Sequence, residues 1–210
     1  MPVQDLPSPD PASDEPSPTP AAALDSAKAA ASESFSSRLA RLCHVAPESL
    51  RALPGPEVPV PYHQLLVHER DMTSTLEGFH RETLRLEVLH LERRGELLLR
   101  RVLLVGENSG LPRELGAIHI HLEHFESAPR AEILEARIPL GTILSRHRVP
   151  YQSRPSAFHV LSASQELVTL LPSTEEGRLL YGRSNRLLDP GSGLPLAEVL
   201  EILPPSKPQS

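Results

Sequence analysis

The chain has 210 residues, of which 39% are hydrophobic, and a formal net charge of −6, values that suit one domain with a sizeable core. Six acidic residues and one lysine give residues 1–34 a charge of −5, so the rest is close to neutral, which argues against a nucleic-acid-binding surface. A single cysteine, Cys43, excludes an internal disulfide framework and a thiolate metal cluster.

The two ends of the chain differ in composition from its middle. Residues 1–34 are rich in Pro, Ser, Ala and Asp and lack periodic apolar positions, so we predict a disordered tail there and a short disordered end over 206–210. Residues 35–205 then form one domain. The start has no basic and apolar leader, and no apolar run approaches ~18 residues, so we expect a cytoplasmic protein without a membrane partner.

Apolar residues follow helical spacing at the start of this domain. The spacing predicts a helix from Phe35 that includes Cys43 in its packed stripe, and a second short helix near 47–53. Residues 62–79 predict two short helices, the second beginning near Asp71 or Met72.

After residue 82 the apolar residues follow the alternating pattern of strands, except in one helical stretch. Turn signals separate the strand-like segments, which predicts six or seven antiparallel strands. These segments are 83–91, 96–106, 114–122, 157–163, 166–172, 178–188 and 194–204. Two short helices are predicted over 127–136, with Ser127 as its cap and Pro129 in its first turn, and over 138–147. Strands with grouped helices indicate the α+β class.

The strand-like segment 96–106 is apolar on both faces but has two arginines in its middle. Because side chains alternate along a strand, Arg100 and Arg101 point to opposite faces. The inward guanidinium cannot shed its charge and needs an anionic partner. That partner is either an internal Asp or Glu, or the carboxylate of a ligand held by paired hydrogen bonds.

Four short motifs occur in a recognisable order. They are Met72-Thr73 with Glu77, Leu99-Arg100 with Leu103 and Leu104, Pro139-Leu140-Gly141 with Leu144, and Gly182-Arg183 with Arg186-Leu187 through Leu203-Pro204. In this order they resemble the chorismate pyruvate-lyase family, whose members make 4-hydroxybenzoate from chorismate. The resemblance covers roughly residues 60–205.

The resemblance implies a six-stranded antiparallel sheet, with helices flanking one face and closing a buried aromatic-acid site that needs no cofactor. Arg100 matches the family arginine that binds the ligand carboxylate. Met72 and Leu140, with Gly141, match flap positions that line the pocket and offer backbone groups.

The family also has a glutamate on its last strand, near the hydroxyl end of the ligand, and here the sequence departs from the pattern. Counting from the preceding turn puts Leu200 at that position, whereas a one-residue bulge would bring Glu201 to it; Glu198 shares the face of Leu200. Glu201 and Glu198 are therefore the candidate catalytic acids. The family arginine of the third strand is replaced around residues 116–117.

A possible metal site lies in segment 117–125. In an extended chain His119, His121 and Glu123 share one face, and two histidines with a carboxylate can hold a catalytic metal. The reaction of the resembled family needs no metal, so we interpret the histidines as sheet-face residues and predict no metal site. A hydrogen bond from one of them to a ligand is the other alternative.

The leading hypothesis is a chorismate pyruvate-lyase-like enzyme that releases pyruvate in a metal-free site. The main alternative is a non-enzymatic aromatic-acid-binding module, because ligand-sensing domains of transcription regulators resemble the same fold. A helix-turn-helix segment should then precede the domain, and residues 1–34 show no such pattern. A scaffold protein is a third possibility. The expected partner is a small aromatic or cyclohexadienyl carboxylate, with no nucleic acid and no membrane. The sequence does not give the oligomeric state, and a monomer is favoured.

Overall fold

The computed structural model describes residues 34–206. Apart from Ser34 and Ser206, the two predicted disordered ends lie outside the described residues. Ser34 caps the first described helix by accepting a hydrogen bond from the backbone N–H of Ser37, and the backbone N–H of Ser206 donates to the Tyr62 hydroxyl at 3.1 Å.

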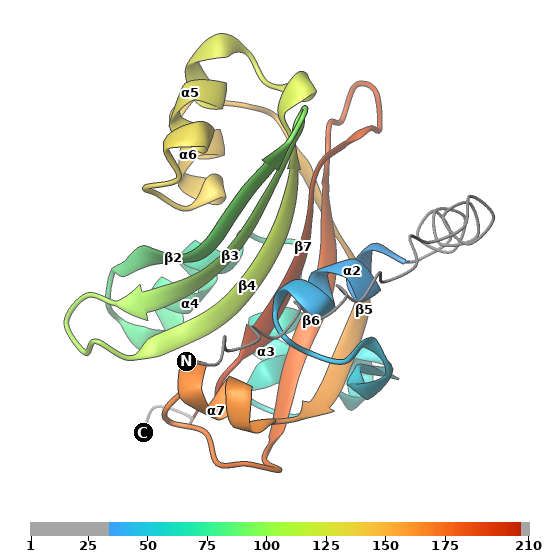
Figure 1. Ribbon diagram of the computed structural model, residues 1–210, viewed down its shortest axis with the longest axis vertical. Coiled ribbons are helices and arrows are strands. Elements are labelled where there is room, and N and C mark those ends of the chain that lie inside the picture. The colour runs from blue at the N-terminus through green and yellow to red at the C-terminus, as the bar shows by residue number, and fades with distance from the viewer. Residues whose placement is uncertain (1–33, 207–210) are drawn as a thin grey trace, which may run out of the picture. The chain divides into compact units, whose positions relative to one another are not determined.

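The centre of the domain is one antiparallel sheet of seven strands in the order β1-β5-β6-β7-β4-β3-β2 (Figure 1). The strands are β1 (Arg51–Leu53), β2 (Leu84–Arg94), β3 (Leu97–Gly106), β4 (Pro112–His121), β5 (Gln152–Ser162), β6 (Leu179–Leu188) and β7 (Pro195–Leu203). The predicted α+β class with an antiparallel sheet is confirmed. The seventh strand is the three-residue β1, which pairs with β5 at one edge.

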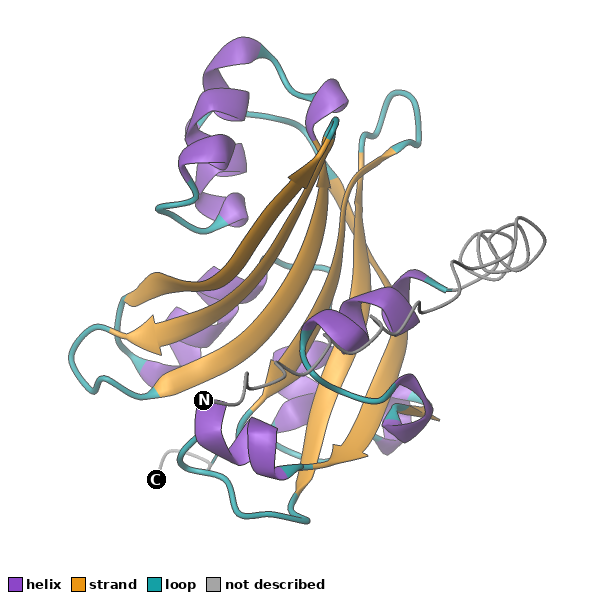
Figure 2. Ribbon diagram, viewed as in Figure 1, coloured by secondary structure: helices purple, strands orange, loops and turns teal. Residues whose placement is uncertain are grey.

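Helices flank this sheet on both faces, not on one face as expected (Figure 2). The α-helices are α2 (Phe35–Leu42), α3 (Tyr62–Leu66), α4 (Met72–His80), α5 (Ser127–Glu135), α6 (Leu140–Arg146) and α7 (Gln165–Leu170). The helices α2 and α7 cover the side opposite to the other helices. Short 3₁₀ turns are η1 (Pro47–Ser49), η2 (Gly55–Glu57) and η3 (Leu122–His124). No helix within residues 34–206 combines the length and the apolar character that a membrane crossing requires.

Two predicted elements have a different secondary structure. Segment 166–172 was expected as a strand, but it forms α7, because the Ser164 side chain accepts a hydrogen bond from the backbone N–H of Leu167 and starts a helix. Leu167 and Leu171 lie one turn apart and are both buried. Segment 47–53 was expected as a helix and instead divides into η1 and the edge strand β1.

The helix α2 covers one face of the sheet, where it contacts β4 and β7. Leu39 and Cys43 are fully buried there, against Leu115 and Leu200 of the sheet. The helix α7 belongs to the same apolar layer through Leu167. This surface is called the α2 face below.

The thiol of Cys43 is expected to be unreactive in the folded protein. The side chain has no exposed surface, and burial raises its pKa to about 12, so little thiolate forms at pH 8. Ellman's reagent should therefore give no reaction with native protein and one equivalent after unfolding in urea. A fast native reaction would show that α2 opens readily from the sheet.

The opposite face carries two separate apolar clusters. Beneath α5 and α6, the register row Leu98, Ile120 and Ala197 belongs to one cluster. Beneath α3 and α4, Leu104 and Leu203 belong to the other. The candidate site lies on the sheet rows between these two helix pairs. We call this side the cavity face.

Candidate binding site

A cavity opens on the cavity face between the helix pairs α3/α4 and α5/α6. Its empty volume is about 690 Å³, including the solvent at its mouth. The floor comes from β3, β4, β6 and β7, while the residues that begin α4 and α6 form part of the rim. The wall combines aliphatic side chains, for example Val102, Ile118 and Val199, with polar and charged ones.

The strand register brings four charged groups to this floor. Directly paired residues of antiparallel strands point to the same face, so each register row forms one line of side chains. One row consists of Arg100, Ile118, Val199 and Asn185. The next row consists of Val102, Gly116, Glu201 and Arg183. Glu114, two residues from Gly116 on β4, also faces the cavity.

Arg100 is a buried cation without a protein partner in the described part of the chain. The residue is 2% exposed, and its Nε and Nη1 atoms have no hydrogen-bond partner there. Burial lowers its pKa to about 10, which leaves the guanidinium charged at neutral pH. Of the two partners considered from the sequence, the internal carboxylate is not found among residues 34–206.

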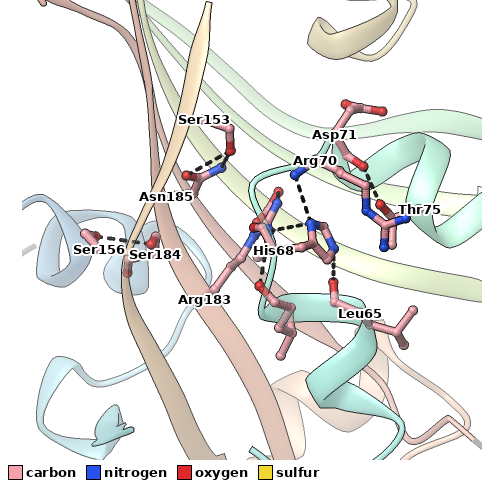
Figure 3. A network of polar contacts seen from close by, with 12 residues as sticks. Leu65, His68, Arg70, Asp71, Thr75, Ser153, Ser156, Arg183, Ser184 and Asn185 are labelled. Atoms are coloured by element: carbon pink, nitrogen blue, oxygen red, sulfur yellow. Dashed lines mark hydrogen bonds and ion pairs between the residues drawn. The ribbon is translucent and has the colours of Figure 1, made fainter. Parts of the chain in front are cut away.

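Arg183 and Glu201, in contrast, form a saturated buried pair. The Nε of Arg183 donates to one carboxylate oxygen of Glu201, and Nη2 donates to the other at 3.5 Å. The Nη1 of Arg183 donates to the backbone carbonyls of Leu66 at 3.2 Å and His68 at 2.9 Å. Figure 3 shows how Arg183 reaches from β6 to the segment that follows α3. The pair thereby ties the sheet to that segment.

Glu114 is a buried acid that the sequence analysis did not single out. Burial raises its pKa well above the ordinary value of 4.5, the Glu201 carboxylate raises it further, and Arg183 opposes the shift. All of this favours the neutral, protonated form of the carboxyl group. Its Oε2 atom has no hydrogen-bond partner among residues 34–206. The signal for it was the alternation of β4, which places Glu114 on the same face as the apolar Ile118 and Ile120.

Glu114 should make the stability of the protein decrease as the pH rises. Its pKa is higher in the folded than in the unfolded chain, so above about pH 4.5 the folded state binds more protons, and the free energy of unfolding falls toward the folded pKa. Glu114→Gln cannot titrate. We expect its stability relative to wild type to rise between pH 5 and 8, by at most about 1.4 kcal/mol per pH unit, in urea titrations. If the difference in free energy of unfolding between Glu114→Gln and wild type does not change with pH, Glu114 does not have a raised pKa.

The flap residues Met72, Leu140 and Gly141 all line the cavity. Met72 and Leu140 are the first residues of α4 and α6 and are 5% and 6% exposed. The N-cap of α4 is Asp71, whose side chain accepts a hydrogen bond from the backbone N–H of Ser74 at 2.8 Å. The two helix starts touch, because a Cβ atom built on Gly141 would lie 2.2 Å from Asp71 Oδ1.

Gly141→Ala is therefore expected to separate the two helix starts. The added methyl group overlaps the Asp71 carboxylate, so either this cap or the start of α6 must shift. The loss of stability should be small, roughly 1 kcal/mol, comparable to the loss of a helix cap. The free energy of ligand binding should decrease by more than the free energy of unfolding does. Gly78→Ala in α4 is the matched control, because nothing lies within 4 Å of its added methyl group.

Of the two candidate acids of the last strand, the structure brings Glu201 to the cavity and Glu198 to the opposite face. Glu198 lies on the α2 face, 3.8 Å from the guanidinium of Arg38 and 3.5 Å from that of Arg186. The assignment of Glu198 to the cavity is therefore corrected. The pairing of β6 with β7 shifts between Leu187 and Leu188, next to the turn that joins the two strands, so counting residues from the turn misplaces the row.

The histidines of segment 117–125 lie away from the cavity. His119 is on the α2 face, paired in register with Glu198, and burial lowers its pKa to about 4. The strand β4 ends at His121, so Glu123 falls in η3 rather than on the strand. Within residues 34–206 there is no group of three or more His, Cys, Asp or Glu side chains arranged to hold a metal ion.

Comparisons with known proteins identify the fold rather than a family. No family model matches the chain, and no curated protein matches it either. Among solved structures, PhnF from Mycobacterium smegmatis is similar with a TM-score of 0.52 and 8% identity, covering 86% of this chain and 93% of that one.

Two further structures are similar at lower scores. The possible transcriptional regulator YydK from Bacillus subtilis has a TM-score of 0.49 and 12% identity over 89% of this chain and 87% of that one. The C-terminal domain of the histidine utilization repressor from Pseudomonas syringae has a TM-score of 0.43 and 16% identity over 60% and 95%. The likeness to PhnF concerns the fold alone, and the two lower TM-scores carry no further weight. The chorismate lyase-like α+β fold is shown, whereas nothing singles out the lyase family.

Proposed function

We propose that this domain binds a small organic monocarboxylate in the cavity and that Arg100 holds the carboxylate group. The observation that supports this most strongly is the charged, buried guanidinium of Arg100, for which residues 34–206 provide no anion. A buried charge without a partner is costly. A ligand carboxylate, which can accept two parallel hydrogen bonds from a guanidinium, would remove that cost.

The surroundings of Arg100 favour a flat apolar ligand body. The aliphatic part of the wall suits a ring, in keeping with the aromatic or cyclohexadienyl carboxylate expected from the resemblance. Met72, Leu140 and Gly141 would close over the ring from the two helix starts. The N–H of Ser74 is already bound to the Asp71 cap, which leaves the backbone N–H groups of Met72 and Thr73 at the start of α4 as further donors for the ligand.

The geometry supports binding better than lyase chemistry. The leading hypothesis assigned Glu201 to a catalytic step, but both of its carboxylate oxygens accept hydrogen bonds from Arg183. An acid that is held in this way is a poor proton carrier, because releasing or accepting a proton would break a buried ion pair. A role for Glu201 in holding the shape of the site therefore fits better than a role in turnover.

The proposal is tested by titrating the full chain with benzoate and 4-hydroxybenzoate in a calorimeter, and with the uncharged benzamide and 4-hydroxybenzamide as matched controls. The carboxylates should bind at least about tenfold more tightly than the amides, because only they pair with Arg100. Equal affinities would contradict the proposal. Incubation with chorismate should release no pyruvate above the rate without protein; release that depends on the protein would support the lyase hypothesis instead.

A further inference from the structure

We propose that Glu114 is a second anchor in this cavity: as a neutral carboxylic acid it donates a hydrogen bond to an oxygen of the ligand that lies away from the carboxylate on Arg100. The domain would then select hydroxy- or oxo-monocarboxylates over plain monocarboxylates and over dicarboxylates. This inference rests on the proposed function and assigns the role to β4, rather than to the glutamate of the last strand that the resemblance implied.

The position of the Glu114 carboxyl group follows from Gly116. A Cβ atom built on Gly116 would lie 2.9 Å from Oε1 of Glu114, so the carboxyl group extends over the glycine into the row of Val102 and Glu201. That row is two residues, ~7 Å, from the row of Arg100 along the strand direction. The separation is about that of the two substituents at opposite ends of one six-membered ring.

Besides Arg100, Glu114 is the lining residue that has a buried polar atom without a hydrogen-bond partner among residues 34–206. Arg183 and Glu201 use their groups on each other and on backbone carbonyls. Asn185 and Ser153 form a mutual pair, in which Nδ2 donates to Oγ at 3.0 Å (Figure 3). The Oε2 atom of Glu114, in contrast, is buried without a partner among residues 34–206. An unmade buried hydrogen bond is unfavourable, so a ligand that completes it gains affinity.

The charges around Glu114 explain why it acts as a donor. Burial disfavours a negative charge on Glu114, and Glu201 on β7 and Asp71 at the start of α4 add to this effect and raise its pKa. Arg183 on β6 opposes them, but it is already paired with Glu201. The buried charged groups of the lining then leave one unmatched positive charge, on Arg100. This balance suits a ligand with a single negative charge and leaves a second carboxylate without a cation.

The experiment compares four probes on wild type and three variants. The probes are benzoate, 3-hydroxybenzoate, 4-hydroxybenzoate and terephthalate. Glu114→Leu removes the donor, Glu114→Gln keeps an uncharged donor, and Gly116→Ala keeps the acid but displaces its carboxyl group. The measured quantity is each probe's affinity relative to benzoate on the same protein, which cancels any general effect of a substitution on the cavity. Urea midpoints check that each variant is folded.

Wild type should bind one of the two hydroxybenzoates about tenfold more tightly than benzoate, the usual effect of one buried hydrogen bond. Terephthalate should bind more weakly than that hydroxybenzoate. The preference should disappear in Glu114→Leu, decrease in Gly116→Ala and largely remain in Glu114→Gln. If Glu114→Leu does not fold, the hydroxyl preference of Glu114→Gln compared with that of Gly116→Ala still tests the role of Glu114.

Two other outcomes are distinguishable. If benzoate binds in a manner that depends on Arg100 but the hydroxyl preference is absent, or is equal in wild type and Glu114→Leu, the inference about Glu114 is overturned and the proposed function stands. If none of the four carboxylates binds wild type, the proposed function fails and the inference falls with it.

Discussion

Arg183→Leu is expected to lower the free energy of unfolding by roughly 3–5 kcal/mol, because it leaves the Glu201 carboxylate buried without a cation. The Arg183 and Glu201 side chains are only 1% and 7% exposed, so water cannot replace the lost partner. The substitution also removes the donor to the carbonyl of His68 and one of the two donors to the carbonyl of Leu66, which keeps the backbone N–H of His68. Urea-induced unfolding at pH 7 measures the effect.

Two controls define the cause of this loss. Arg183→Leu combined with Glu201→Leu should recover a large part of the stability, because removing both members of a buried ion pair is far less costly than removing one. Arg94→Leu should leave the urea midpoint unchanged, because the pair of Arg94 with Glu92 is exposed to solvent. A loss in Arg183→Leu no greater than in Arg94→Leu would show that the buried pair does not tie β6 to the segment after α3.

The elements that depend on local signals could be predicted from the sequence. Apolar spacing identified α2, and the expected helix start near Asp71 or Met72 agrees with α4, because such signals lie within one helix. Segment 166–172 has the β-branched and apolar content of a strand, and the cap at Ser164 decided its structure. The strand β1 has three residues and exists through its pairing with β5, which is distant in the sequence.

The site could be predicted only where one strand carries the information. Arg100 was found because a cation in an apolar strand is unusual and because adjacent arginines must point to opposite faces. The pairing of Arg183 with Glu201 depends on the register of two strands. A register shift near the turn between them changes which residues are paired along the rest of both strands. Glu114 drew no attention, because an acid near the start of a strand is usually exposed; its burial depends on how β4 lies between β3 and β7.

Arg100→Ala should weaken the binding of a carboxylate ligand by about 1.5–3 kcal/mol, or one to two decades in affinity, because it removes a charge-assisted contact in a buried site. The stability of the ligand-free protein should stay unchanged or rise, since the substitution removes a buried guanidinium that has no anion among residues 34–206. A buried ion pair behaves in the opposite way, as described for Arg183.

Arg101→Ala is the matched control, one residue along the same strand. Arg101 lies on the α2 face, where its Nη1 donates to the backbone carbonyl of Leu42 at 3.2 Å, so its loss should leave ligand affinity unchanged. Calorimetric titration with 4-hydroxybenzoate and urea midpoints for both variants separate the possibilities. An Arg100→Ala protein that unfolds early, and that binds the ligand as tightly as wild type does, would show that Arg100 pairs with an anion of the protein itself and that the carboxylate anchor lies elsewhere.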